Sequence, residues 1–390
     1  MSHRGIRIFR CLFLKGGPIL IGWVLMLPEF SGPTDAVHPQ RPLMACARLA
    51  DTATFPALRT WYVMGTVLTV WIPQVPPQRA REVSERIYRR IRDLDREMSL
   101  YRADSALWRL NRSAGQGPVR VSRDLWNVIA RAIQISRDTR GDFDITVGPY
   151  MMLWGFFGGI PRRPTSEEIR SVRRRVGYPK IRLNRIHRTV ELLEPGMVLD
   201  LGGIAKGYAV DEAVRILRDA GIRRALVHLG GEIYVLGPGP TPDCPWVIGI
   251  RHPRRPHDVW RYILLVNMAV STSGDTERYL VIRGKRYPHI LSPHTGQPVR
   301  HAVRSVTVVA PTATWADGLA SALWVAGPRR GRAHLRRIHA PCAFVLWIVE
   351  RMGQLHEVAA FIRHMPADQR CASVRVIQRT LSDTGRNVHR

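Results

Sequence analysis

The stretch that decides the fold occupies residues 198–211 and reads Val-Leu-Asp-Leu-Gly-Gly-Ile-Ala-Lys-Gly-Tyr-Ala-Val-Asp. It predicts a strand, a tight turn at Gly202 and Gly203, and then a helix. The apolar residues of that helix recur on one face that packs on a sheet, at Ala209, Ala213, Ile216 and Leu217. Glycines permit positive φ or a close backbone approach, and the amides of a helix N-terminus attract anions. With the charge of Lys206, the stretch predicts a phosphate site for a nucleotide-type ligand, although glycine turns before helices are too common to establish function alone.

The composition is that of an ordinary globular protein with an unusual charge. The 390 residues are 45% hydrophobic and 23% charged, which suits one large domain or two modest ones. The formal net charge of +28 would by itself suggest nucleic acid, an anionic membrane or an acidic partner. The basic residues are nevertheless spread along the whole chain without a cluster of interleaved aromatic residues. We therefore interpret most of them as solvated surface and expect no specific nucleic-acid site.

The N-terminal residues have the arrangement of an export signal. Basic residues between Arg4 and Lys15 precede an apolar run over residues 16–27, which is too short for a confident membrane span. Residues 43–46, Leu-Met-Ala-Cys, resemble a lipoprotein cleavage box, but they lie far downstream of the apolar run, so lipidation of Cys46 stays open. The five cysteines form no metal-binding pattern and no obvious disulfide framework, and we interpret them as small buried side chains.

The remaining pattern predicts a mixed α+β protein with largely antiparallel sheets and packed helices. A strand is expected at residues 63–72, a helix at 83–98, and a second helix from the N-cap Ser122 to Gly141. Short strands between Gly/Pro turns are expected at 225–229, 233–236, 246–250, 262–266 and 303–309, and a strand–turn–strand at 343–361. The predicted organisation is a leader and linker at 1–58, one domain at 59–361, and a basic tail at 362–390 without an assigned function.

A second candidate site lies in the stretch Ala-Asp-Gly-Leu-Ala-Ser at residues 316–321. Asp317 and Ser321 are four residues apart, so on a helix both project from the same face. A carboxylate and a hydroxyl, completed by waters, a backbone carbonyl and substrate phosphate oxygens, suit Mg²⁺. An ordinary helix with an acidic residue near its N-terminus explains the pair without a metal, and the two residues alone favour that simpler interpretation.

Several other motifs occur in a fixed order along the chain. They are Met-Gly-Thr at 64–66, Met-Ser-Leu-Tyr-Arg-Ala-Asp-Ser at 98–105 with Leu-Asn at 110–111, Gly-Asp-Phe-Asp-Ile-Thr-Val-Gly-Pro-Tyr from 141, Ser-Thr-Ser-Gly-Asp at 271–275, His-Ile-Leu-Ser-Pro-His-Thr-Gly at 289–296, and the stretch 306–323. Together with residues 199–211 they make the chain similar to the FAD:protein FMN transferase family, the ApbE-type flavin transferases, over about residues 64–361. The resemblance implies an ApbE-like architecture and Mg²⁺-dependent transfer of FMN from FAD to a threonine of an acceptor protein, with release of AMP.

The resemblance also implies residue roles. Asp317, Ser321 and the main chain of Gly203 would hold Mg²⁺, and His289 would accept the threonine proton or orient a phosphate. The residues that would contact the flavin nucleotide are Met64, Tyr101, Asp142, Phe143, Asp144, Asp200 and Lys206. Without the resemblance, core, turn or cap positions would explain most of these residues equally well.

Two departures from the family pattern concern the expected substrate contacts. Ser292 stands where the family usually has Asp, and Gly202-Gly203 replaces a more usual Ser-Gly pair; neither change removes the proposed metal carboxylate. Because pyrophosphate chemistry needs a cation and phosphate donors but little acid–base machinery, an FAD pyrophosphatase and a flavin-binding protein without turnover stay open as alternatives.

The expected partners are FAD and an acceptor protein. The resemblance implies that the acceptor carries the flavin on a threonine and is a membrane-associated electron-transfer subunit. The export signal and the resemblance together predict a location in the periplasm or on the periplasmic side of the inner membrane, with possible membrane anchoring through a lipid at Cys46.

Overall fold

The computed structural model describes residues 57–73, 75–240, 245–255, 257–274, 279–299, 301–338, 343–362 and 374–377. The leader, the segment around Cys46 and all five cysteines lie outside these residues, so the expectations about them stay predictions. Within the part that the structure describes, no helix combines the length and the apolar composition needed to cross a membrane.

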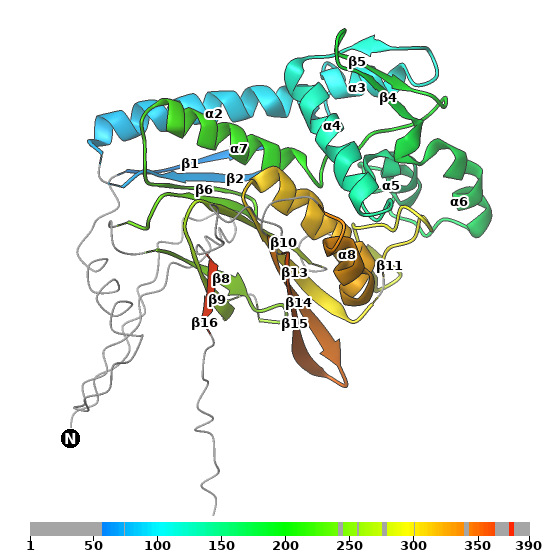
Figure 1. The fold of residues 1–390 in the computed structure, drawn as a ribbon. Coiled ribbons are helices and arrows are strands. Elements are labelled where there is room, and N and C mark those ends of the chain that lie inside the picture. The colour runs from blue at the N-terminus through cyan, green and yellow to red at the C-terminus, as the bar shows by residue number, and fades with distance from the viewer. Residues whose placement is uncertain are drawn as a thin grey trace, which may run out of the picture.

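An eight-stranded antiparallel sheet forms the centre of the molecule (Figure 1). Its strands, in spatial order, are β1 (Leu58–Val63), β2 (Thr66–Trp71), β6 (Ala225–Leu229), β7 (Glu232–Leu236), β10 (Met268–Gly274), β13 (Val303–Ala310), β14 (Ala343–Arg351) and β15 (Gln354–Ile362). Every pairing in this sheet is antiparallel. The sheet and the helices beside it confirm the predicted α+β class.

Three smaller sheets surround the large one. They consist of β8 (Trp246–Arg251), β9 (Val259–Leu265) and β16 (Val374–Ile377); β3 (Val119–Arg120), β4 (Ile181–Asn184) and β5 (Thr189–Leu192); and the hairpin of β11 (Tyr279–Ile282) and β12 (Lys285–Pro288). β16 belongs to the segment expected to be a basic tail, and it pairs with β9 in antiparallel register. At least these four residues of the tail therefore contribute to a sheet.

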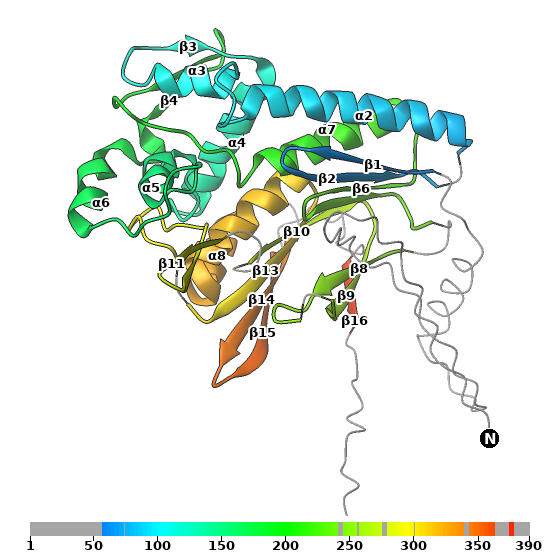
Figure 2. The same cartoon turned by 180° about the vertical axis from the view of Figure 1, so that it is seen from behind.

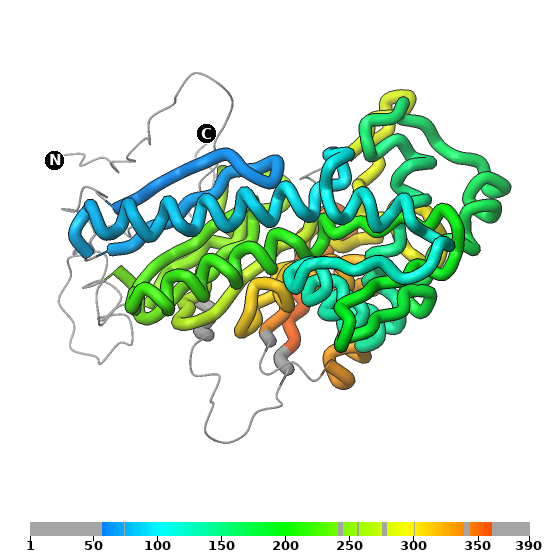
Figure 3. Tube along the Cα trace, turned by 90° about the horizontal axis from the view of Figure 1, so that it is seen from above, coloured from blue at the N-terminus to red at the C-terminus, as the bar shows by residue number. Residues whose placement is uncertain are grey.

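Three long helices cover the large sheet: α2 (Pro77–Met98), α7 (Ala205–Asp219) and α8 (Ala313–Leu335) (Figures 1 and 2). Figure 3 shows α2 and α7 side by side. Arg79 reaches the carbonyl of Ala220 and Arg90 reaches Glu212, so the two helices run antiparallel. As a result, the C-terminal end of α2 lies beside the N-terminal end of α7, where the glycine turn is.

A second group of elements gathers at one end of the molecule. The helices α3 (Ala106–Arg112), α4 (Arg123–Asp138), α5 (Gly148–Trp154) and α6 (Ser166–Val172) lie there with the β3–β5–β4 sheet (Figure 1). Single 3₁₀ turns at Ile145–Val147, Arg173–Arg175 and Tyr178–Lys180 connect them. The turn at Gly296 packs against α5, because Trp154 donates to the carbonyl of Gly296 at 2.9 Å, and a Cβ added there would lie 2.8 Å from the Tyr150 ring.

Most of the predicted elements are confirmed. α2 and α4 occupy the two predicted helices, and the Ser122 hydroxyl caps α4 by accepting the Leu125 N–H at 3.0 Å. The four apolar residues predicted for the packed face of the helix after the glycine turn, Ala209, Ala213, Ile216 and Leu217, are all buried in α7. β6, β7, β8, β9, β13 and the closing β14–β15 hairpin lie within a few residues of their expected positions.

Two predicted strands are wrong in detail. The strand expected at 63–72 is the hairpin of β1 and β2, because Met64 and Gly65 form a turn with positive φ values of 53° and 70°. The strand expected before the glycine turn is absent at residues 198–201. The backbone of this segment forms its hydrogen bonds with groups outside any sheet. The Asn111 side chain accepts the Leu199 N–H at 2.8 Å and donates to the Leu199 carbonyl at 3.1 Å, and the Asp200 N–H donates to the Ile145 carbonyl at 2.7 Å.

Candidate active site

The glycine turn makes a close backbone approach and keeps ordinary negative φ. Neither Gly202 nor Gly203 has a positive φ, and the Asp200 carboxylate accepts the Gly202 N–H at 2.8 Å to form the turn. A Cβ added to Gly203 would lie 3.1 Å from the Ser321 hydroxyl and 3.3 Å from the Phe143 ring. The turn therefore brings three residues that the sequence predicted for the site into contact, although they come from three separate segments.

Carboxylates exchanged between α7 and α8 hold the two helices together at this point. The Asp317 carboxylate of α8 accepts the N–H of Gly207 at 2.9 Å, in the first turn of α7, where backbone N–H groups have no partner within the helix. Asp211 of α7 accepts the N–H groups of Ala313 and Thr314, at 2.7 and 2.9 Å, in the first turn of α8. Both carboxylates thus act as helix caps supplied from the neighbouring helix.

Asp317 is a buried carboxylate with few hydrogen-bond partners among the described residues. Its side chain is 3% exposed, and burial raises the pKa of Asp317, while the positive charge of Lys206 and the Gly207 N–H oppose that rise. Among the described residues, the Gly207 amide is its one hydrogen-bond donor and uses a single carboxylate oxygen. A cation beside the second oxygen would compensate the buried charge.

Lys206 lies between the glycine turn and a second buried carboxylate. Its ammonium nitrogen is 3.3 Å from an oxygen of Glu232 and 3.4 Å from the Gly202 carbonyl. Glu232 begins β7 and is 5% exposed. The immediate surroundings of the turn therefore contain two buried carboxylates and one lysine, and a bound divalent cation would stabilise the ionised form of both carboxylates.

The donor set around the turn has the character of a hard-cation site. It consists of the Asp317 carboxylate, the Ser321 hydroxyl four residues later on α8, and the backbone at Gly203 against that hydroxyl. The described residues contain no group of three or more His, Cys, Asp or Glu side chains placed to hold a metal. Any ion here would rely on oxygen ligands that include a hydroxyl, a carbonyl, water and substrate, which is the mode that Mg²⁺ prefers.

Asp142 is a buried carboxylate that contacts three basic side chains. One carboxylate oxygen contacts Nε2 of His294 at 3.0 Å and an Arg330 nitrogen, and the other contacts Nε2 of His334 at 2.6 Å. Burial alone would raise the pKa of Asp142, but the two histidines and the Arg330 charge outweigh it and hold the pKa at about 2. Both oxygens are occupied by protein groups, so the direct contribution of Asp142 is to fix this segment; its contact with flavin stays a prediction.

Asp144 also ties its segment to the surrounding loops. One oxygen accepts the N–H and the hydroxyl of Thr146, and the other accepts the Tyr178 N–H at 2.7 Å. Burial raises the pKa of Asp144. Phe143 lies between these two anchored aspartates and faces Gly203, so the segment holds an aromatic ring against the glycine turn.

Met64 and Tyr101 lie near the same end of α2. The Met64 N–H donates to the Asp95 carboxylate of α2 at 3.2 Å, and Tyr101 follows the end of the helix. Tyr101 is 65% exposed and meets the Phe157 ring edge to face at 6.2 Å. Since this end of α2 adjoins the start of α7, both residues are on the side of the molecule that carries the turn.

His289 follows β12 and is half-buried. It opens the stretch 289–296, in which the Ser292 carbonyl accepts the N–H groups of Thr295 and Gly296 and the Ile290 carbonyl accepts the Val299 N–H. The role of His289 as a proton acceptor stays a prediction.

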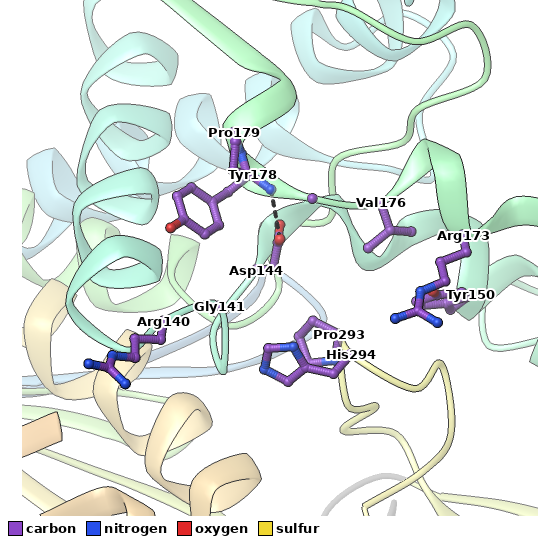
Figure 4. A pocket seen from close by; sticks show the side chains of 11 residues that line it. Arg140, Gly141, Asp144, Tyr150, Arg173, Val176, Tyr178, Pro179, Pro293 and His294 are labelled. Carbon is purple, nitrogen blue, oxygen red and sulfur yellow. Dashed lines mark hydrogen bonds between the residues drawn. The ribbon is translucent and has the colours of Figure 1, made fainter. Parts of the chain in front are cut away.

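An open cavity of about 260 Å³ is lined by Gly141 and Asp144, at the two ends of the segment that carries Phe143 (Figure 4). Of the predicted site residues, Asp144 lines it, together with Arg140, Arg173, Tyr178 and His294. This cavity is therefore separate from the contacts of Gly203, Lys206 and Asp317.

Sequence reasoning missed three residues that shape the site: Asn111, Asp211 and Glu232. Asn111 and Asp211 occur in the motifs quoted above and were interpreted only as parts of those motifs, whereas Glu232 lies outside them. An acidic residue at an inward position of an apolar strand was the available indication for Glu232. The side-chain bonds of Asn111 and Asp211 to distant backbone groups have no local sequence pattern.

A glycine turn, a lysine and a buried carboxylate on a helix-covered antiparallel sheet define a site for a phosphate-bearing ligand. The chain belongs to the ApbE family, because a model of that family matches residues 64–346. It is 33% identical over 281 residues to the FAD:protein FMN transferase of Escherichia coli K12, covering 70% of this chain and 79% of that protein. It is 36% identical over 257 residues to the Haemophilus influenzae protein of the same name, and the match covers 64% of this chain and 73% of that protein.

Solved structures show the same relationship. The flavin transferase ApbE from Vibrio cholerae superimposes with a TM-score of 0.68 at 34% identity, covering 78% of this chain and 96% of that one. The ApbE protein of Thermotoga maritima superimposes with a TM-score of 0.68 at 33% identity, and the match covers 77% of this chain and 96% of that one. These relationships confirm the resemblance and the ApbE-like architecture predicted from the sequence.

Proposed function

We propose that this chain is a Mg²⁺-dependent FAD:protein FMN transferase that attaches FMN to a threonine of an acceptor protein and releases AMP. The observation that carries the proposal is the contact of Gly203 with Ser321 beside the buried Asp317, in a member of the ApbE family. The names of the relatives, FAD:protein FMN transferase, support the substrate and the protein acceptor.

The proposed metal ligands are Asp317, Ser321 and the Gly203 main chain. When bound, Mg²⁺ would neutralise charge on the FAD diphosphate and orient its oxygens. Lys206 would add a second positive charge, and Glu232 would hold the lysine beside the turn. The Asp200 turn would keep the local backbone in place for the diphosphate.

The reaction is a phosphoryl substitution at the FMN-side phosphorus. The threonine oxygen forms the new P–O bond, the P–O bond to AMP breaks, and AMP leaves with the bridging oxygen. We assign the threonine proton to His289, which would accept it as the bond forms. Positioning and charge neutralisation supply most of the catalysis in this type of transfer.

The flavin nucleotide would lie against the residues that face the same side of the molecule. Phe143 supplies an aromatic wall at the turn, and Met64 and Tyr101 would contact the nucleotide from the end of α2. Asp142 and Asp144 would act mainly by fixing Phe143. We further propose that the acceptor is a membrane-associated electron-transfer subunit, reached in the periplasm or at the periplasmic side of the inner membrane.

The test is a labelling assay with the purified full chain. The enzyme, FAD and a candidate electron-transfer subunit expressed without its flavin are incubated with Mg²⁺ or with EDTA. We expect a covalent fluorescent flavin band on the acceptor and an equal amount of AMP, both only with Mg²⁺. Release of FMN and AMP at the same rate without acceptor would replace the proposal with a pyrophosphatase, and FAD binding without either product would indicate a flavin-binding protein.

A further inference from the structure

We infer that a basic groove beside the site, lined by Arg140, Arg170, Arg173 and His294, binds an acidic, extended segment of the acceptor protein. This inference rests on the proposed function, because it assigns the surface on which the protein substrate docks. We call this surface the arginine groove.

The arginine groove consists of two adjoining cavities. The cavity of about 260 Å³ in Figure 4 includes Arg140, Arg173 and His294. A second cavity of about 510 Å³ shares Arg173 and His294 with it and adds Arg170 and Gln297. In Figure 4, Arg140 and Arg173 lie toward opposite ends of the view, with His294 between them. Two open cavities that share lining residues suit an extended chain, whereas a small anion would need donors that converge on one point.

The three arginines of the groove have no carboxylate partner among the described residues. Within the part of the chain that the structure describes, none of the three guanidinium groups forms an ion pair with a carboxylate, and all three side chains are exposed. The carboxylate in the wall, Asp144, is buried and accepts N–H groups of Thr146 and Tyr178. Arginine presents several donors that match carboxylates, so this surface is complementary to an acidic polypeptide.

His294 is held in the groove by the buried carboxylate of Asp142. Its Nε2 contacts the Asp142 carboxylate, which also binds Arg330 and His334. Arg330 and His334 thus fix the carboxylate that orients His294. A rigid wall at the junction of the two cavities reduces the cost of ordering the protein when a partner binds.

The groove and the proposed reaction site share a backbone segment. Phe143 faces Gly203 on one side, while its neighbours Asp142 and Asp144 bond His294 and Tyr178, which line the groove. His289, the proposed proton acceptor, is five residues before His294 in the same stretch. A polypeptide that follows the arginine groove therefore runs alongside the place where its threonine must react.

The kinetic test compares two double variants of the full chain. Arg170→Ala/Arg173→Ala removes two groove charges, and Arg86→Ala/Arg89→Ala removes two exposed charges from the outer face of α2 as a matched control. Labelling rates are measured with the acceptor varied at saturating FAD, and then with FAD varied. We expect the groove variant to raise the KM for the acceptor about tenfold, with kcat and the KM for FAD unchanged, because each lost contact is charge-assisted. Equal effects of both double variants, or a raised KM for FAD in the groove variant, would overturn the inference.

A binding test works without a known acceptor. The probe is a fluorescein-labelled decapeptide of alternating Asp and Gly, with an Asn/Gly decapeptide as the neutral control and inorganic phosphate and FAD as competitors. We expect binding that weakens with salt, is lost in the groove variant and persists in the α2 variant. Displacement by FAD or by phosphate would instead indicate a small-anion site and overturn the inference. If the wild type labels no acceptor but this binding pattern holds, the proposed function fails while the acidic-segment site stands.

Discussion

The substitution Asp317→Asn separates the two functions that the structure gives this carboxylate. An asparagine keeps an oxygen that can accept the Gly207 N–H, so the cap on α7 is retained. It removes the negative charge that is proposed to bind Mg²⁺. We therefore expect activity and stability to respond differently to this one change.

The two magnitudes follow from the contacts. Loss of a group that only supports a metal ligand weakens affinity about 10–100-fold, so loss of the acidic ligand itself should raise the Mg²⁺ requirement at least about 100-fold, or about 2.7 kcal/mol. The retained hydrogen bond becomes neutral, which costs about 1 kcal/mol, and removal of a buried charge offsets part of this cost. Asp317→Ala leaves the Gly207 N–H without its acceptor and should lower the free energy of unfolding by about 1–3 kcal/mol.

The assay is the acceptor-labelling rate as a function of Mg²⁺ concentration, with urea unfolding measured on the same samples. Asp211→Asn is the matched control, because Asp211 caps α8 from the other helix and is assigned no metal contact. It should lose stability and keep the wild-type Mg²⁺ requirement. Wild-type labelling and an unchanged Mg²⁺ requirement in Asp317→Asn would refute the reasoning.

Three other predictions follow from single contacts. Asp142→Asn should lower the free energy of unfolding by at most about 2 kcal/mol at pH 7. Because the pKa of Asp142 is about 2 in the folded protein, its ionised carboxylate stabilises the wild type above about pH 4, and this stabilisation is lost as the pH falls toward 2. The urea midpoints of the wild type and the variant should therefore converge near pH 2. Glu232→Gln removes the carboxylate that contacts Lys206 and should raise the KM for FAD about tenfold in the labelling assay, whereas Glu232→Asp, which keeps a carboxylate, should raise it less. An unchanged KM for FAD in Glu232→Gln would exclude a positioning role for Glu232. Asn111→Ala should lower the unfolding free energy by about 2 kcal/mol, since it leaves both backbone groups of Leu199 without their partner, and equal stability by urea unfolding would contradict this.

The elements with strong periodic patterns could be predicted from the sequence alone. The helix at 83–98 and the helix capped by Ser122 have their apolar residues on one face, and that face is buried in the structure. The later strands are short apolar segments separated by Gly/Pro turns. In both cases the local pattern agrees with the tertiary packing. The strand expected at 198–201 failed because an extended apolar stretch looks the same whether a sheet or an asparagine side chain satisfies its backbone.

Some features of the candidate site could likewise be predicted from the sequence, and others could not. The spacing of Asp317 and Ser321 predicted a shared helix face, and the glycines predicted the close approach that brings Gly203 to Ser321. The exchange of caps between α7 and α8 was not predictable, because it joins residues about a hundred positions apart. Charge spread evenly along the sequence likewise gave no indication that arginines from separate segments gather in one groove.

The most direct measurement is anomalous diffraction from crystals of the full chain soaked with FAD and Mn²⁺, which takes the same oxygen ligands as Mg²⁺. We predict one strong peak at coordinating distance, about 2.0–2.2 Å, from an Asp317 oxygen and the Ser321 hydroxyl, in contact with the FAD diphosphate. A diphosphate bound away from the 202–206 turn, or a metal peak that does not touch Asp317, would contradict it.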